Sequence, residues 1–498
     1  MQPIEYYQIG GFRAHLKDNS NDALTAKLMR DGVEADFVLG IQPCGASSLL
    51  LPCTKFTRLH LGRPRDPPRY ASEYESLSPI QFATKRDLSA KFAMLVSTKK
   101  TTDGIPRDRS KANTAYTVGG NYLSEIGIAR SSFEHQRVFY RLCQSTIERP
   151  IDYALNLAPW FKSVRMFSLA FNTWASDTRS LPEREEDPQV LDVGWTEFVA
   201  PNDSADLTAL STSHYVIEEQ RFLGNPGRKK LSLPDITQSM TRATIATLLQ
   251  DVFAPSRDGA PKPPMILLVH DAKMTRCVLK SFGVDTSLWR AGIKDLLYFP
   301  DARVTPRQTS YHESKRDVRD YSAKWKRERS RSPRRSNVAN YPSRPRSPPQ
   351  PHAPPPVYLV DVQQMYQNLM QVPKNESIMA HALMFAVRDT APVRGEDDTI
   401  IYEDVDPQSW CAGRESRLIG YVWEEMANSI AIDEQRASRH LFSKEELIEV
   451  YPGAPGCAGG DDDVDPNDIV QPGAHSGNPA PAPKPMGMYD SASEDDEW

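Results

Sequence analysis

The feature that most constrains the fold is the short apolar run Met265–Val269, Met-Ile-Leu-Leu-Val, which closely follows three prolines. A continuous apolar run of this length is typical of a strand that is buried on both faces of a parallel or mixed sheet. The residues from Ala272 to about Phe282 then predict a helix. The run Val357–Val362, followed by Gln363–Met370, repeats the same order of strand and helix. Alternating strands and helices of this kind indicate an α/β domain.

Three further strand candidates precede this pattern. They are Val164–Phe171, Val190–Val199 and a short strand that begins at Tyr215–Ile217. The residues from about Ser232 to Phe253 predict a helix, and Ser377–Val387 and Arg414–Met426 predict two more. We therefore expect an α/β domain over about 160–430, with one mixed central sheet flanked by helices and with its leading three strands antiparallel.

Residues 1–155 carry a weaker pattern. Helical periodicity occurs at Leu88, Phe92 and Leu95, and again at Phe133, Phe139 and Leu142. No group of residues in this stretch has catalytic spacing. We expect an N-terminal extension or small module of unknown role, either helical or poorly packed.

The net charge of −5, from 60 Lys and Arg against 65 Asp and Glu, hides a strong asymmetry. Residues 311–350 hold 12 Lys and Arg against 4 Asp and Glu, whereas residues 452–498 hold 1 Lys against 10 Asp and Glu. The balance excludes a uniformly basic nucleic-acid coat. Neither segment can bury enough apolar area to offset its ordering entropy. We expect a disordered basic insertion rich in Arg, Ser and Pro at 311–356, inside the α/β domain, and a disordered acidic tail at 452–498.

The basic insertion is the first candidate binding site. Its nucleic-acid-binding candidates are Lys324, Lys326, Arg327, Arg329, Arg331, Arg334 and Arg335. Guanidinium groups on a flexible chain suit contacts with RNA phosphates and base planes. Phosphorylation at Ser332 or Ser347 would weaken that attraction by adding negative charge. The same cluster is also compatible with a nuclear import signal or with a solvated spacer.

The cysteines and the hydropathy bear on compartment and metals. The six cysteines form no Cys-x-x-Cys pair, which argues against a structural zinc site. The N-terminus has no basic and apolar signal sequence, and no apolar run approaches the ~18–20 residues that cross a bilayer. We expect free thiols, no membrane association and an intracellular protein, nuclear or shuttling between nucleus and cytoplasm.

Four landmarks along the α/β segment resemble a known family. They are Leu191–Gly194, His214–Ile217, Leu267–Thr275 and Trp410–Ser416. In this order, following the strand candidate at 164–171, they resemble the ribonuclease-H-like fold of DEDD-type exonucleases. More narrowly, the segment is similar to a fungal family of exonuclease-like C-terminal domains, one member of which is linked to messenger-RNA export. The resemblance covers about 160–430.

The resemblance implies a site that this chain has altered. Cleavage of a phosphodiester with two metal ions requires converging carboxylates and a histidine that takes a proton from water. The family's four carboxylate positions and its histidine position correspond here to Ala170, Asn172, Thr275, Glu415 and Trp410, in that order. Only Glu415 keeps a carboxylate. The resemblance therefore implies a catalytically inactive domain with no metal cofactor that binds RNA or a protein.

Two other functions remain open at the level of the sequence. Asp192, Asp271, Asp361 and Glu415 could regroup around Mg²⁺ or Mn²⁺ and form an active 3′–5′ exonuclease. A purely structural interaction scaffold is the third hypothesis, with protein partners that the sequence does not identify. Local structural roles also explain individual residues: Asp271 as a helix cap, Glu415 beside a helix N-terminus, Trp410 in packing and His270 as a structural histidine.

Overall fold

The protein is described here by a computed structural model of the full chain. Described residues lie between 4 and 439, and they exclude 11–20, 30–34, 62–63, 65–66, 97–109, 114–123, 157–160, 162, 202–205, 255–262, 299–356, 372–375, 388, 390–392, 395–399 and 402–407. All of them belong to one compact unit. The predicted disordered segments at 311–356 and 452–498 lie outside the described residues, as do the seven basic candidates from Lys324 to Arg335.

The N-terminal residues form a sheet, and this corrects the expectation of a small helical or poorly packed module. Five strands, all paired antiparallel, lie in the order β4-β1-β3-β2-β5. They are β1 (Glu5–Gly10), β2 (Ala35–Ile41), β3 (Ser47–Pro52), β4 (Arg69–Tyr70) and β5 (Ser76–Phe82). The helices α1 (Asn21–Leu28), α2 (Cys53–Arg58) and α3 (Lys85–Leu95) accompany them. The strands are short and their pairing partners are distant in sequence, so no single window carried the signal.

The second sheet has seven strands and is mixed, as predicted. Their order is β10-β8-β7-β6-β11-β13-β12. They are β6 (Arg165–Thr173), β7 (Val190–Val199), β8 (Thr208–Ile217), β10 (Thr237–Met240), β11 (Met265–Val269), β12 (Arg290–Ala291) and β13 (Val357–Asp361). The strands β6, β7 and β8 are antiparallel, while β11 pairs parallel with both β6 and β13. The α/β class and the pairing of 265–269 with the strand at 357 are confirmed.

Two boundaries differ from the prediction. The strand expected to begin at Tyr215 is β8, which starts at Thr208. The helix expected from Ser232 is α6 (Arg242–Phe253), and the preceding residues form β10, which pairs with His214–Ile217. Thr241 caps α6 by accepting a hydrogen bond from the Thr244 N–H, so the helix begins where the capping side chain is available.

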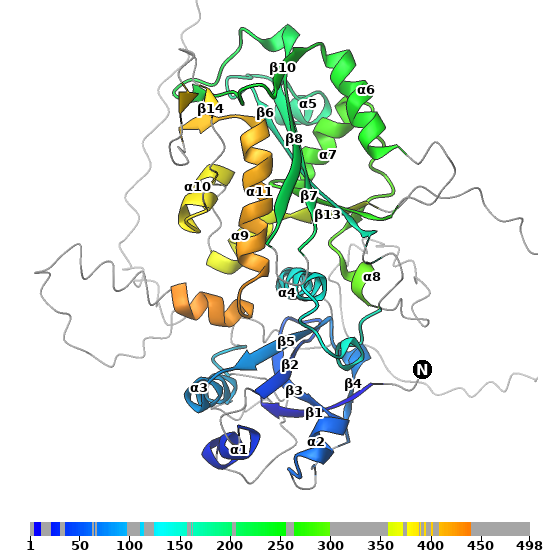
Figure 1. The fold of residues 1–498 in the computed structure, drawn as a ribbon, viewed down its shortest axis with the longest axis vertical. Helices are drawn as coiled ribbons and strands as arrows, with labels where there is room; N and C mark the ends of the chain where they lie inside the picture. The colour runs from blue at the N-terminus through cyan, green and yellow to red at the C-terminus, as the bar shows by residue number, and fades with distance from the viewer. Residues whose placement is uncertain are drawn as a thin grey trace, which may run out of the picture. The chain divides into compact units, whose positions relative to one another are not determined.

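Strand alternation divides the core of this sheet between two helical layers. Even-numbered side chains of β11, such as Ile266 and Leu268, pack with α4 (Glu125–Cys143), α9 (Val362–Met370), α10 (Ile378–Met384) and α11 (Ala412–Ala427). Odd-numbered ones, such as Leu267, pack with α6 and α7 (Ala272–Ser281). Figure 1 shows α11 on one side of the sheet and α6 and α7 on the other. This arrangement follows from the two-residue period of a strand, which exposes successive side chains to opposite faces.

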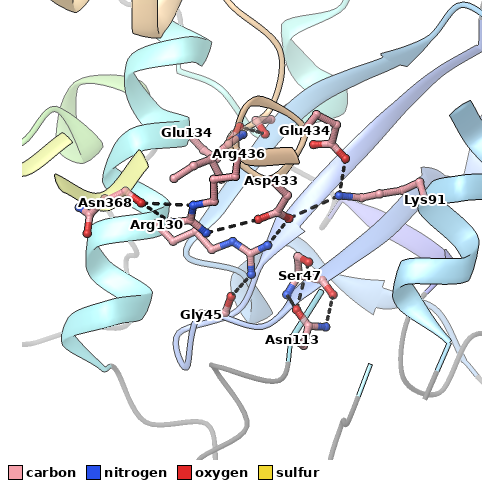
Figure 2. A network of polar contacts seen from close by, with 12 residues as sticks. Gly45, Ser47, Lys91, Asn113, Arg130, Glu134, Asn368, Asp433, Glu434 and Arg436 are labelled. Carbon is pink, nitrogen blue, oxygen red and sulfur yellow. Dashed lines mark hydrogen bonds and ion pairs between the residues drawn. The ribbon is translucent and has the colours of Figure 1, made fainter. Parts of the chain in front are cut away.

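A buried charged network ties the N-terminal sheet to the residues after α11. The helix α4 packs against both β5 and α11, and residues 432–439 are also helical. Asp433 forms ion pairs with Arg130 of α4 and Lys91 of α3, and Lys91 also pairs with Glu434 at 2.6 Å (Figure 2). Burial raises the pKa of Asp433, but the neighbouring cations outweigh it and lower that pKa to about 2. The carboxylate is therefore held in its charged form between two elements.

Among the described residues, no helix is long and apolar enough to cross a membrane.

Candidate functional site: a cavity at the end of β6

Three of the sequence landmarks meet at one cavity of about 250 Å³. Ala170 and Asn172 reach it from β6, and Glu415 reaches it from the first turn of α11. His270 and Asp271, at the end of β11 and the start of α7, line the same cavity, as does Arg228. Residues separated by more than 240 positions therefore share one site, as the positions implied by the resemblance require.

Close packing of α11 on the sheet brings Glu415 to this position. A Cβ atom at Gly194 of β7 would lie 2.4 Å from the backbone of Ala412, so only glycine permits this approach. A Cβ atom at Gly413 would lie 2.6 Å from the Cβ of His214. The approach places the Glu415 carboxylate beside Asn172, whose Nδ2 donates a hydrogen bond to Oε2 at 2.9 Å.

The charge of Glu415 is poorly compensated. Its side chain is buried, and burial together with the nearby charge of Asp192 raises its pKa to about 7. The charge of Arg228 and the amide of Asn172 act in the opposite direction. Arg228 is oriented by a hydrogen bond that its Nη2 donates to the Ser409 carbonyl oxygen at 2.9 Å. A guanidinium and an amide thus surround a carboxyl group that is half protonated near neutral pH.

Asp192 lies beneath the cavity and is committed to other partners. Its Oδ2 is hydrogen-bonded to His214 Nε2 at 2.8 Å and accepts the N–H of Ala412, at the start of α11, at 2.9 Å. Burial lowers the pKa of His214, but Cys411 and the bond to Asp192 outweigh it and raise that pKa to about 10. The pair therefore anchors the N-terminus of α11 on the sheet, and Asp192 does not line the cavity.

The other acidic candidates act as helix caps. Asp271 Oδ1 accepts the Met274 N–H at 2.9 Å and caps α7, as the local interpretation of the sequence predicted. Asp361 caps α9 through the Gln364 N–H at 2.7 Å and also accepts the Ala272 N–H at 2.9 Å. Of these two, only Asp271 lines the cavity.

Thr275 and Trp410 are not brought into the cavity. Thr275 is buried one turn after Asp271 and donates its hydroxyl to the Asp271 carbonyl oxygen at 2.6 Å. Trp410, in the short strand β16 (Ser409–Trp410), is 1% exposed, and the Lys230 ammonium lies 5.3 Å from its ring centre. Its indole Nε1 is buried and makes no hydrogen bond within the described part of the chain. Trp410 is a packing residue at this place.

His270 and His381 form a buried pair beside the cavity. Their ring centres are 5.2 Å apart, and the His381 ring stacks on Tyr366 at 3.7 Å. Burial lowers the pKa of His270 to about 4, and burial with the neighbouring His270 lowers the pKa of His381 to about 3. Both rings are therefore neutral near pH 7.

Sequence reasoning missed the loop from Arg221 to Lys230, Arg-Phe-Leu-Gly-Asn-Pro-Gly-Arg-Lys-Lys, which follows β8 and reaches the cavity through Arg228. Asn225 fixes it to the end of β6, because its Oδ1 accepts the Ala175 N–H at 2.7 Å and its Nδ2 donates to the Thr173 carbonyl at 3.2 Å. The strand β9 (Lys229–Lys230) pairs parallel with β16. The signal that could have identified this loop was its basic run together with an isolated phenylalanine.

Phe222 stands out within this loop. Its side chain is 85% exposed, and the guanidinium carbon of Arg221 lies 4.5 Å from the ring centre. The loop therefore presents an exposed aromatic ring and several cations next to the cavity.

Comparisons with protein-family models, curated proteins and solved structures found no match to this chain. Within the described residues, no group of three or more His, Cys, Asp or Glu side chains is arranged to hold a metal ion.

Proposed function

We propose that residues 160–430 form a ribonuclease-H-like, exonuclease-like domain that has lost its hydrolytic chemistry and binds single-stranded RNA. The mixed sheet supports this fold, since three leading antiparallel strands are followed by strands parallel to the first. The convergence of Ala170, Asn172 and Glu415 on one cavity supports the correspondence of positions.

The composition of the cavity is the observation that carries the loss of hydrolysis. Two divalent ions bring about four positive charges, which clustered carboxylates must compensate. Here the cavity offers a methyl group at Ala170, an amide at Asn172 and one uncommitted carboxyl group at Glu415. The Arg228 guanidinium adds a positive charge that opposes the entry of a metal cation. The donor set therefore does not fit a two-metal centre.

The same geometry disfavours a rearranged nuclease. Asp192 and Asp361 are bound to buried partners and helix starts, and neither lines the cavity. Moving them toward Glu415 would leave His214 and the N-termini of α7 and α11 without their carboxylate partners. Trp410, at the histidine position of the family, has no basic nitrogen and cannot take a proton from water.

The loop from Arg221 to Lys230 is the feature that favours RNA. Sequence-tolerant binding of single strands combines a cationic track for phosphates with exposed aromatic rings on which bases stack, each worth about 1–3 kcal/mol. Phe222 supplies such a ring, and Arg221, Arg228 and the two following lysines supply the charges. The basic segment Lys324–Arg335 would extend the same attraction along the strand. A role in RNA metabolism and a nuclear location belong to this proposal.

The loss of hydrolysis is tested with purified protein, an end-labelled RNA or DNA oligonucleotide and Mg²⁺ or Mn²⁺. We expect intact oligonucleotide, and we expect neither metal to raise the melting temperature, since a ligand without affinity for the native state does not shift unfolding. Processive shortening that disappears in Glu415→Gln would establish a rearranged nuclease instead.

RNA binding is tested by fluorescence anisotropy with a single-stranded oligonucleotide. We expect Phe222→Ala to weaken binding about fivefold or more, whereas Leu210→Ala, which truncates a side chain of β8 that is 65% exposed, leaves it unchanged. Deletion of residues 319–346 should remove most of the affinity and reduce the salt dependence, which falls by about 0.7 per lost phosphate contact. Equal affinity for all of these proteins would exclude RNA binding through either element.

A further inference from the structure

A second cavity lies on the N-terminal sheet, away from the site at β6. Its volume is about 420 Å³, and it is bordered by the first residues of β2, the helix α2, the C-terminal end of α4 and residues 146–153. The 3₁₀ helix Pro150–Tyr153 contributes Tyr153 to its wall. A cavity of this size is in the range that takes a small organic ligand.

Three cations face this cavity without a carboxylate partner among the described residues. Lys55 and Arg58 come from α2, and Arg141 comes from the last turn of α4. The ammonium of Lys55 donates to the Asp36 carbonyl oxygen at 2.6 Å. The Nε of Arg141 is buried and has no hydrogen-bond partner in the described chain. A fourth cation, Arg149, is paired with Asp152 at 3.4 Å and is thereby accounted for.

The protein gains nothing from these positive charges in its ligand-free form. Burial lowers the pKa of Lys55. Burial and the neighbouring Arg137 lower the pKa of Arg141 to about 10. A cation in the last turn of a helix is favourable with the helix dipole, which explains the position of Arg141 alone. It does not explain why two cations from another element face the same space.

The acidic groups around the cavity complement a ligand of mixed character. Asp36 and Glu148 line it but form no ion pair within the described residues. Carboxylates at this range accept hydrogen bonds from hydroxyl groups, while the three cations attract a doubly charged anion. The ligand chemistry that satisfies both sets is a phosphate ester of a hydroxyl-bearing compound.

We propose that this cavity is a binding site for a small phosphate-bearing ligand, with Arg141, Lys55 and Arg58 contacting its phosphate. Arginine presents paired N–H groups that match phosphate oxygens, and lysine adds a compact charge. The hydroxyls of Thr54 and Tyr153 line the same space and complete a polar wall.

The test is isothermal titration calorimetry of the full chain with pyrophosphate and, separately, with adenosine 5′-monophosphate, at fixed ionic strength because salt screens such contacts. We expect saturable binding and a melting temperature that rises with ligand concentration. Binding of both compounds would assign the site to phosphate esters, and binding of pyrophosphate alone would assign it to polyphosphates; both results support a phosphate site. No saturable binding of either compound would overturn the proposal.

Three variants separate a binding role from a structural one. Arg141→Met should weaken pyrophosphate binding by about tenfold or more without destabilising the free protein, since it removes a cation that has no partner. Lys55→Gln should also weaken binding, and it keeps the test valid if Arg141→Met does not fold. Lys85→Gln, at the exposed start of α3 outside the cavity, is the matched control. Equal affinity of Lys55→Gln and Lys85→Gln would refute the site.

Discussion

Glu415→Gln should stabilise the protein, and the gain should depend on pH. The carboxyl group is buried, and its folded-state pKa of about 7 stands above its ordinary value of 4.5. A group whose pKa is raised by folding contributes its full stability below the unfolded-state pKa and loses it as the pH rises through the folded-state pKa. Glutamine reproduces the neutral acid in shape and can still accept the hydrogen bond from Asn172.

The magnitude follows from the two pKa values. One pKa unit corresponds to about 1.4 kcal/mol, so the difference between 4.5 and 7 makes the ionised form about 3 kcal/mol less favourable in the folded state. At pH 8 the group is ionised in both states, and the variant should be more stable by about that amount. At pH 5 the folded group is protonated and the unfolded one is only partly ionised, so the gain should fall below about 1 kcal/mol.

Urea unfolding at pH 5 and at pH 8, monitored by tryptophan fluorescence, measures both values. Glu218→Gln, at an exposed position, controls for the loss of one negative charge from the whole molecule. A gain of equal size at both pH values would refute the reasoning, and so would a loss of stability at pH 8. The second result would mean that the ionised Glu415 is held by Arg228 or by a metal ion more strongly than the burial allows.

Three other changes test the packing and the buried charges. Asp433→Asn should destabilise the protein by about 3–5 kcal/mol, because it leaves two buried cations without their partner, whereas exposed Glu186→Gln should change denaturant stability little. Gly194→Ala should cost about 1–3 kcal/mol through its clash with α11; Gly224→Ala, where a Cβ meets nothing within 4 Å, is the matched control, and equal effects in calorimetry would contradict the close-packing argument. His381→Phe should reduce the fall in melting temperature between pH 7 and pH 5, since its lowered pKa means that the unfolded chain binds more protons there, and an unchanged pH profile would exclude this histidine as the cause.

The sequence by itself determined the elements whose signal is local. The strands β11 and β13 are continuous apolar runs, and such runs are recognisable wherever their partners lie. The helices α7 and α9 follow them and begin at capping aspartates, so strand, cap and helix were all predictable from neighbouring residues. The loss of acidic residues at Ala170 and Asn172 was likewise visible in the sequence, because a side chain's chemistry does not depend on the fold.

Pairing between distant segments was decided only in the tertiary structure. The strand β10, Thr-Gln-Ser-Met, has little apolar character and is a strand because it pairs with the end of β8. The N-terminal sheet was missed for the same reason, and β5 even contains Pro79, which weakens a local strand signal. Strand formation by such segments depends on hydrogen bonds to partners that no sequence window contains.

The two cavities show the same division. Each lining residue can be read from the sequence, but the contact between Asn172 and Glu415 spans 243 positions and exists because α11 packs against Gly194. Arg141 faces Lys55 and Arg58 across more than 80 positions, because α4 packs against the N-terminal sheet. The type of a side chain fixes its charge and its hydrogen bonds, whereas the packing of helices on sheets decides which of these groups share a site.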